Sequence, residues 1–289
     1  DNQIPESSVN VYASGLLIDA NGGVGLSGNR LETSVNTLTA KSTEGNIFLH
    51  DTTSVAVGHV ITAVQQVDNT AGSSEKKVSQ SDIATNQGHL VLEAATDLTL
   101  SDGDSNGKAI STISGNIRLS SSNQDVILNA GVEAGSGNVT AVARRDLDLQ
   151  TGATIQTTDG TVDLTATDRD VLMALGSSVQ TNGGNIRVEA ANSVTLGVLD
   201  ARDQIARDGL DSISQGSWGD VGVVADSGSI TGITGDDQLV NVFARALGMQ
   251  AGTSVGTGET PVHTEVTTLA AHANDGGLFI TDHSDLTVG

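Results

Sequence analysis

The feature that most constrains the fold is a residue pattern that recurs about every 21 to 24 positions between residues 110 and 196. Each repeat contains a glycine, a β-branched residue five positions before it, and apolar residues two and four positions after it. A further coil upstream fits the same alignment, so five glycines align: Gly88, Gly115, Gly137, Gly160 and Gly184. A near-constant period of this length is typical of a solenoid, in which each repeat packs only on its neighbours.

Each repeat divides into three short segments in which apolar and polar residues alternate, separated by Gly, Asn, Asp and Ser. This pattern predicts an all-β chain folded as a right-handed parallel β-helix, with rungs about 4.8 Å apart. The 289 residues predict roughly twelve rungs. Residues at the same offset should stack in buried ladders, for example Ile117, Val139, Val162 and Ile186. An antiparallel sandwich would also explain the alternation, but not the recurring offsets.

A second, longer repeat relates the two ends of the chain. Residues 9–58 align with residues 240–289 at a shift of 231 without a gap, and eighteen of the fifty positions are identical. We call this match the module repeat, and it predicts one continuous solenoid over residues 1–289, built from a module that recurs at this shift. Neither end carries the polar, irregular rung that caps a finished solenoid, so we expect uncapped ends. The chain is then either part of a longer chain or a unit that docks head to tail with other copies.

Two segments interrupt the rhythm, at about residues 62–87 and 197–219. The first is rich in Gln, Ser, Asp and Lys and predicts an outward loop or an irregular rung. The second contains a possible helix N-cap at Asp200 and a glycine stop at Gly209, which predict a short helical turn. The single tryptophan, Trp218, follows that turn.

Composition excludes several classes of partner. The net charge is −22, with only thirteen Lys and Arg residues, so binding to nucleic acid or to an anionic membrane face is electrostatically unfavourable. No apolar run of about twenty residues is present, so we predict no membrane insertion. An acidic, cysteine-free chain rich in Thr, Asp and Asn is compatible with an extracellular or cell-surface location, where salt and divalent cations screen the charge.

The most specific local motif is the sequence Asp-Gly-Asp-Ser-Asn-Gly at residues 102–107. Its spacing is that of a calcium loop, with Asp102, Asp104 and Asn106 as the candidate metal ligands. Ile113 stands where such a loop would carry a bidentate glutamate, and Asp, Asn and Gly also form plain turns. Calcium and a plain turn therefore both remain open, and no other cofactor is predicted.

Polysaccharide lyases and hydrolases also use parallel β-helices, so an enzyme must be considered. Such sites need convergent carboxylates or basic residues, and aromatic platforms for sugar rings. Basic residues are scattered here, and four of the five aromatics are repeat-equivalent pairs, Tyr12 with Phe243 and Phe48 with Phe279, which indicates structural roles. We therefore predict no catalytic residues. The alternative function is a carbohydrate-binding or carbohydrate-active β-helix, with Trp218, Arg202 and Arg207 as the contact surface.

The rungs contain the patterns Gly-Asn-Ile-x-Leu and Asp-Val-x-Leu-x-x-Gly, for example at residues 115–119 and 125–131. In these patterns most of the chain resembles the giant β-strand-repeat surface proteins of bacteria and is similar to filamentous haemagglutinin-like adhesins. The resemblance implies a secreted or surface-anchored rod that holds cells to surfaces or to each other, with no catalytic residues. We thus expect a structural segment of an extracellular fibre or giant adhesin. Its expected partners are itself or further modules, head to tail, with surface glycans as a further candidate.

Overall fold

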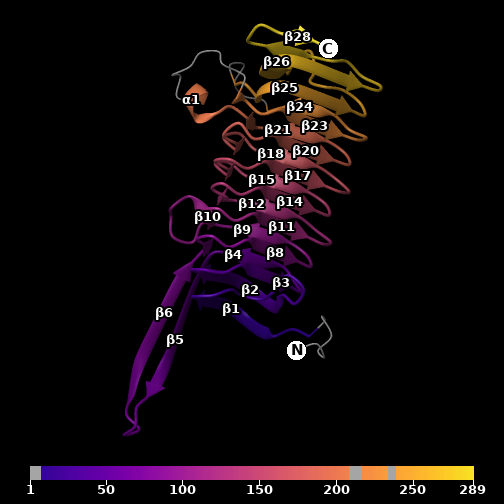
Figure 1. Ribbon diagram of the computed structural model, residues 1–289. Coiled ribbons are helices and arrows are strands. Elements are labelled where there is room, and N and C mark those ends of the chain that lie inside the picture. Colours follow the sequence, from indigo (N-terminus) through magenta and orange to yellow (C-terminus); the bar gives the residue numbers. More distant parts are fainter. Residues whose placement is uncertain (1–7, 208–216, 234–238) are drawn as a thin grey trace.

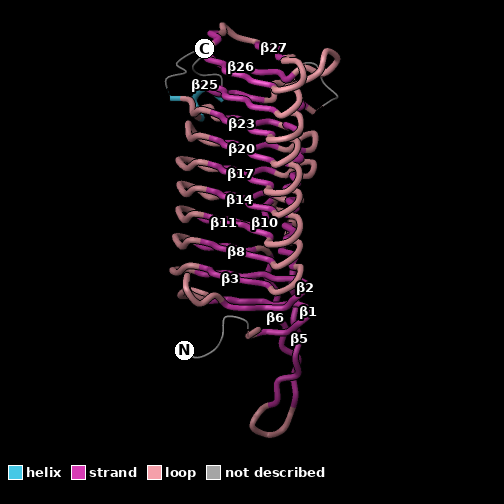
Figure 2. Tube along the Cα trace, turned by 90° about the vertical axis from the view of Figure 1, so that its right-hand side faces the viewer, coloured by secondary structure: helices cyan, strands magenta, loops and turns pink. Residues whose placement is uncertain are grey.

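The computed structural model describes residues 8–207, 217–233 and 239–289, and these form one long parallel β-helix (Figures 1 and 2). Seven coils in the middle of the rod each contribute one strand to a first ladder and one to a second. The first ladder contains β3 (Ile47–Asp51), β8 (Leu90–Ala94), β11 (Ile117–Ser121), β14 (Val139–Ala143), β17 (Val162–Ala166), β20 (Ile186–Ala190) and β23 (Val221–Ala225). The second contains β4 (Val55–Val57), β9 (Leu98–Leu100), β12 (Val126–Leu128), β15 (Leu147–Leu149), β18 (Val171–Met173), β21 (Val194–Leu196) and β24 (Ile230–Gly232).

The third ladder lies between the second and the first along each coil. Its strands are β7 (Ile83–Thr85), β10 (Lys108–Thr112), β13 (Gly131–Glu133), β16 (Thr154–Gln156), β19 (Ser178–Gln180) and β22 (Val198–Asp200). Long strands run across more than one ladder at the two ends of the rod: β1 (Val11–Ala20) and β2 (Leu31–Ser42) at one end, β25 (Val242–Ala251) and β26 (Val262–Ala273) at the other. The short strands β27 (Ile280–Asp282) and β28 (Thr287–Val288) follow β26.

The predicted β-helix and its stacked residues are confirmed. Ile117 pairs with Val139, Val139 with Val162, and Val162 with Ile186, and all four side chains are buried. The β-branched residues before the glycines stack in the third ladder in the same way: Ile83, Ile110, Val132, Ile155 and Val179. Inward aliphatic side chains therefore fill one continuous core along the rod.

The aligned glycines form a column of close backbone contacts. A Cβ atom at Gly137 would lie 2.0 Å from the carbonyl oxygen of Gly115, and one at Gly160 would lie 1.9 Å from that of Gly137. Glycine is therefore needed because the backbone of the preceding rung lies directly against it. Beside this column, the side chain of Asn116 accepts a hydrogen bond from the backbone amide of Asn138 at 2.9 Å.

Among the described strands, eleven stack in the longest ladder, which runs from β1 through β2 and β3 to β26. This is close to the roughly twelve rungs expected from the period. The difference arises because residues 59–81 add no rung but form an antiparallel hairpin, β5 (His59–Val67) and β6 (Ser73–Ser81). Ten steps of about 4.8 Å make the stack about 48 Å high.

The hairpin differs from the outward loop or irregular rung expected at about residues 62–87. Both of its strands lie outside the solenoid and project past β1, roughly along the rod axis in both views (Figures 1 and 2). The chain returns to the third ladder already at β7. In the second excursion the expected helical turn is α1 (Gln204–Arg207), and residues 208–216 lie outside the described residues. No helix in the described ranges is long and apolar enough to cross a membrane.

The module repeat is visible in the backbone. Shifting β1 and β2 by 231 positions reproduces both bounds of β25 and β26. The register is also the same, because Val11 pairs with Thr33 and Val242 pairs with Thr264. Each copy also holds one aspartate whose side chain joins two neighbouring rungs. These are Asp51, which accepts hydrogen bonds from the Thr33 hydroxyl and the Val35 and Thr53 amides, and Asp282, which accepts them from Thr264, Val266 and Ser284.

Candidate functional site

The structure brings two of the three predicted calcium ligands together with a third acid that the motif does not contain. One carboxylate oxygen each from Asp82, Asp102 and Asp104 lies within 4.8 Å of the others. The side-chain oxygen of Asn106, the third predicted ligand, accepts a hydrogen bond from the amide of Lys108 at 2.7 Å. We call Asp82, Asp102 and Asp104 the acid cluster.

The loop that carries Asp102 and Asp104 connects β9 to β10 and is closed by its own aspartate. Oδ1 of Asp102 accepts hydrogen bonds from three successive amides, those of residues 104 to 106, and Oδ2 accepts one from Gly107 at 2.6 Å. The Gly107 amide, with the other loop amides, lowers the pKa of Asp102. These bonds account for the loop conformation without an ion, as the plain-turn interpretation requires.

Asp82 is held differently. It connects β6 to β7, adopts a left-handed φ of 63°, and is only 8% exposed. Its Oδ1 accepts a hydrogen bond from the amide of Gly103 at 2.8 Å, whereas its Oδ2 is buried and has no hydrogen-bond partner among the residues that the structure describes. Burial raises the pKa of Asp82 to about 6, and the charges of Asp104 and Asp102 add to the rise.

Sequence reasoning missed Asp82 because it lies twenty positions before Asp102, outside any local spacing rule. The hairpin β5–β6 leaves the rod after Gly58 and returns at Asp82, which places this residue beside the loop one rung above. Only a contact pattern that includes the hairpin could have revealed it. An aspartate directly before a β-branched ladder residue, Ile83, was the weak local signal.

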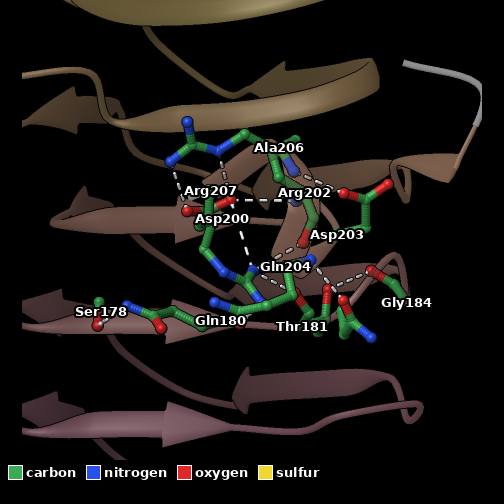
Figure 3. Close-up of polar contacts among 11 residues, drawn as sticks. Ser178, Gln180, Thr181, Gly184, Asp200, Arg202, Asp203, Gln204, Ala206 and Arg207 are labelled. Carbon is green, nitrogen blue, oxygen red and sulfur yellow. Dashed lines mark hydrogen bonds and ion pairs between the residues drawn. The ribbon is translucent and has the colours of Figure 1, made fainter. Parts of the chain in front are cut away.

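Two of the three residues predicted to contact carbohydrate, Arg202 and Arg207, form an internal polar network instead of an open surface (Figure 3). Trp218 is only 6% exposed. Arg202 donates two hydrogen bonds to the carboxylate of Asp200, at 2.9 and 2.7 Å, and its guanidinium lies 3.7 Å from the ring centroid of Phe243. Arg207 donates to the carbonyl oxygens of Thr181 and Arg202. This network fastens the second excursion to β19, β22 and β25.

The two ends of the rod expose equivalent surfaces in different ways. Phe243 lies under Arg202, whereas its counterpart Tyr12 is 75% exposed. Val242 and Ala244 are fully buried because β22 lies beneath β25, whereas Val11 is half-buried and Ala13 exposed. The free side of β1 therefore presents the surface that another rung covers in β25.

Comparison of the chain with protein-family models, with curated proteins and with solved structures found no match. The similarity to filamentous haemagglutinin-like adhesins therefore rests on the rung patterns alone and stays a prediction.

Proposed function

We propose that this chain is a structural repeat unit of an extracellular fibre or giant surface adhesin, whose rungs continue head to tail into further units. Its role is to supply length and stiffness, not catalysis. The observation that carries the proposal is the module repeat, which presents the same strands twice in the same register. Among the described residues, a rung lies beneath the second copy and none lies beneath the first.

The second copy shows what would cover the first. β25 stacks on β22 through Leu199 with Val242, and on β23 through Val221 with Leu247. Val11 and Leu16 of β1 are the counterparts of Val242 and Leu247 at the shift of 231. A rung beneath β1 would therefore pair with Val11 and Leu16. The rung that fits beneath β1 is therefore one equivalent to β22 and β23, supplied by a preceding unit. In that arrangement a counterpart of Arg202 would stack on Tyr12.

The strand register also defines the geometry of such a fibre. Eight steps of the longest ladder lead from Asp51 to Ala273, and Asp282, the counterpart of Asp51, lies nine positions further along the chain. One unit thus advances by about eight and a half rungs, or about 40 Å. Asp51 belongs to the first ladder, whereas Asp282 belongs through Thr264 and Val242 to the third, that of β22, so successive units are rotated relative to one another about the rod axis.

The geometry does not favour the carbohydrate alternative. Sugar rings stack on exposed aromatic faces, and Trp218, the aromatic on which that prediction depends, is buried against Arg202. A glycan screen remains the direct test of that alternative, since binding that disappears in Trp218→Ala would support it.

The test of the proposed function uses the native material. We expect electron micrographs to show long uniform filaments and the denatured chain to have a mass far above 29.2 kDa, because tandem units in one chain need no new interface. If the filaments instead dissociate on denaturation into chains of 29.2 kDa, the units are separate chains that associate head to tail without a covalent link. Isolated short rods would contradict the proposal.

A further inference from the structure

We propose that a divalent cation, with calcium as the best fit, binds between the carboxylates of Asp82, Asp102 and Asp104. The ion would fasten the base of the β5–β6 hairpin to the loop between β9 and β10. This site does not depend on the head-to-tail arrangement.

The buried Oδ2 oxygen of Asp82 favours a bound cation. A buried carboxylate oxygen without a partner destabilises the folded state, because it loses its hydration and gains no hydrogen bond in return. Oδ1 of Asp82 is satisfied by Gly103, so Oδ2 alone is left without a partner. A cation is the partner that satisfies this oxygen and also offsets the repulsion from Asp102 and Asp104.

The spacing and the chemistry of the acid cluster suit calcium. Calcium binds oxygen at about 2.3 to 2.6 Å, so two ligands on one ion lie at most about 5 Å apart. The three carboxylate oxygens lie within 4.8 Å of one another, which lets one calcium ion contact all three. Magnesium demands shorter bonds and near-ideal octahedral geometry, which suits it less well. Asp104 is exposed, so water can complete the coordination.

The acid cluster lies where the base of the hairpin meets the rod. The loop glycine Gly103 packs so closely on the hairpin base that an added Cβ would lie 2.8 Å from Gly58 and 2.9 Å from both His59 and Ser81. Ser81 donates a hydrogen bond to the carbonyl of Gly103 at 3.1 Å. Asp82 belongs to the hairpin side of this contact, and the other two acids of the cluster belong to the rod side. An ion between them therefore joins hairpin and rod.

The test is calcium titration of the intact protein after treatment with chelator. At ten millimolar calcium we expect the melting temperature to rise by about 2 to 5 °C, given an affinity on the order of 10⁻⁴ to 10⁻³ M for an exposed site of this kind. Hydrogen exchange of the hairpin amides in residues 59–81 should slow at the same time. Asp82→Asn should weaken calcium binding at least about tenfold yet melt higher than the unchanged protein in chelator, because an amide removes the buried charge.

Asp104→Asn serves as the second variant, because its exposed position makes misfolding no explanation for lost binding. Asp68→Asn is the matched control. Asp68 closes the hairpin tip with the same kind of loop hydrogen bonds as Asp102, but it lies outside the cluster. It should leave the calcium response unchanged. No calcium response in the unchanged protein, or an equal response in all three variants, would overturn the proposal.

A separate observation concerns a shallow groove near the other end of the rod. The groove crosses the outer faces of β23, β25 and β26 and is lined by small and apolar residues, among them Gly222, Val224, Gly248 and Ala270. Its lining also includes Gly289, the counterpart of Gly58, which directly precedes the hairpin. We infer that this groove is the seat of the β5–β6 hairpin of the following unit, an inference that rests on the proposed function.

The first copy shows how the hairpin covers this surface. Gln80 of the hairpin donates hydrogen bonds to the carbonyl of Ile18 and to the hydroxyl of Thr39, and Thr39 is fully buried. The counterpart of Thr39 is Ala270, which is exposed. The second copy thus has the same surface without its cover.

The hairpin also carries apolar side chains that have no cover in the first copy. Val60 and Gln80 face the rod, and alternation along each strand places Thr62, Val64 and Val78 on the same face. Val64 is 54% exposed and Val78 is 48% exposed, because this part of the hairpin extends past β1 (Figure 2). In a continued rod they would lie over the rung equivalent to β23, where Gly222 leaves open space for them.

The test uses a chain in which residues 59–289 follow Gly289 directly, giving two units. The protein contains no cysteine, so a disulfide can form only between introduced residues. Gly222→Cys in the first unit and Val78→Cys in the second should cross-link readily. The control replaces Val78→Cys with Ser79→Cys, on the opposite hairpin face, and should cross-link at least about tenfold more slowly, because its Cβ points away. A doubled rod with equal or no cross-linking would overturn the groove inference alone, whereas a rod that fails to lengthen would overturn the proposed function.

Discussion

At the scale of single residues, the aspartates in the turns before the second ladder bind the backbone of the next rung. The side-chain oxygens of Asp97, Asp125, Asp146 and Asp170 accept hydrogen bonds from the amides of Asp125, Asp146, Asp170 and Ser193, at 2.8 to 3.2 Å. Arg169 lies 3.3 Å from Asp146, which offsets part of the repulsion within the stack. These four aspartates thus have a structural role that needs no ligand.

The ladder residues give the sharpest prediction at this scale. Val162→Asp places a carboxylate in the core between Val139 and Ile186, and we expect it to destabilise the neighbouring rungs by at least about 3 kcal/mol, because a buried charge without a partner loses its hydration. Hydrogen exchange of β14, β17 and β20 would measure the effect. Thr165→Asp, on the outer face of β17, should change little. Similar exchange in the two variants would contradict the assigned inner face.

At the scale of elements, the parallel strands were predictable and the hairpin was not. Alternating Val, Ile and Leu at offsets fixed by the turn glycines determine the register of the strands, because a slip of one residue would move every apolar side chain to the outside. The hairpin strand β6 is almost entirely polar and packs on little besides β5 and the edge of β1 and β2. β6 forms because the chain folds back and pairs with β5. This hairpin is what brings Asp82 close to Asp102.

The second excursion offers a prediction at the same scale. Arg202→Ala should destabilise the attachment of the excursion to β22 and β25 by about 2 to 3 kcal/mol, because it leaves the buried carboxylate of Asp200 without its bidentate partner. Arg144→Ala is the control, since its ion pair with Asp168 is exposed and should contribute at most about 1 kcal/mol. Both effects can be read from hydrogen exchange of β22 and β25. Equal losses in the two variants would show that the network around Arg202 contributes no more than a surface pair.

At the scale of the whole molecule, the module repeat and the strand register together specify a continuous rod. Each unit adds about eight and a half rungs and ends on a different face of the rod, so hairpins of successive units should point in different directions. The sequence repeat alone predicted the module, but not the change of face. The change of face arises because the hairpin and the second excursion lengthen individual coils, and only the strand pairing shows how many coils one module makes.

The most direct test of this account is the length of rods built from one, two and three units, measured by electron microscopy or small-angle X-ray scattering. Each added unit should lengthen a straight rod by about 40 Å, because the shared strands of neighbouring units occupy the same rungs. Copies that stack end to end without sharing rungs would instead add about eleven rungs, or about 53 Å. A flexibly bent chain of separate rods, or the larger increment, would contradict the claim that the solenoid runs unbroken from unit to unit.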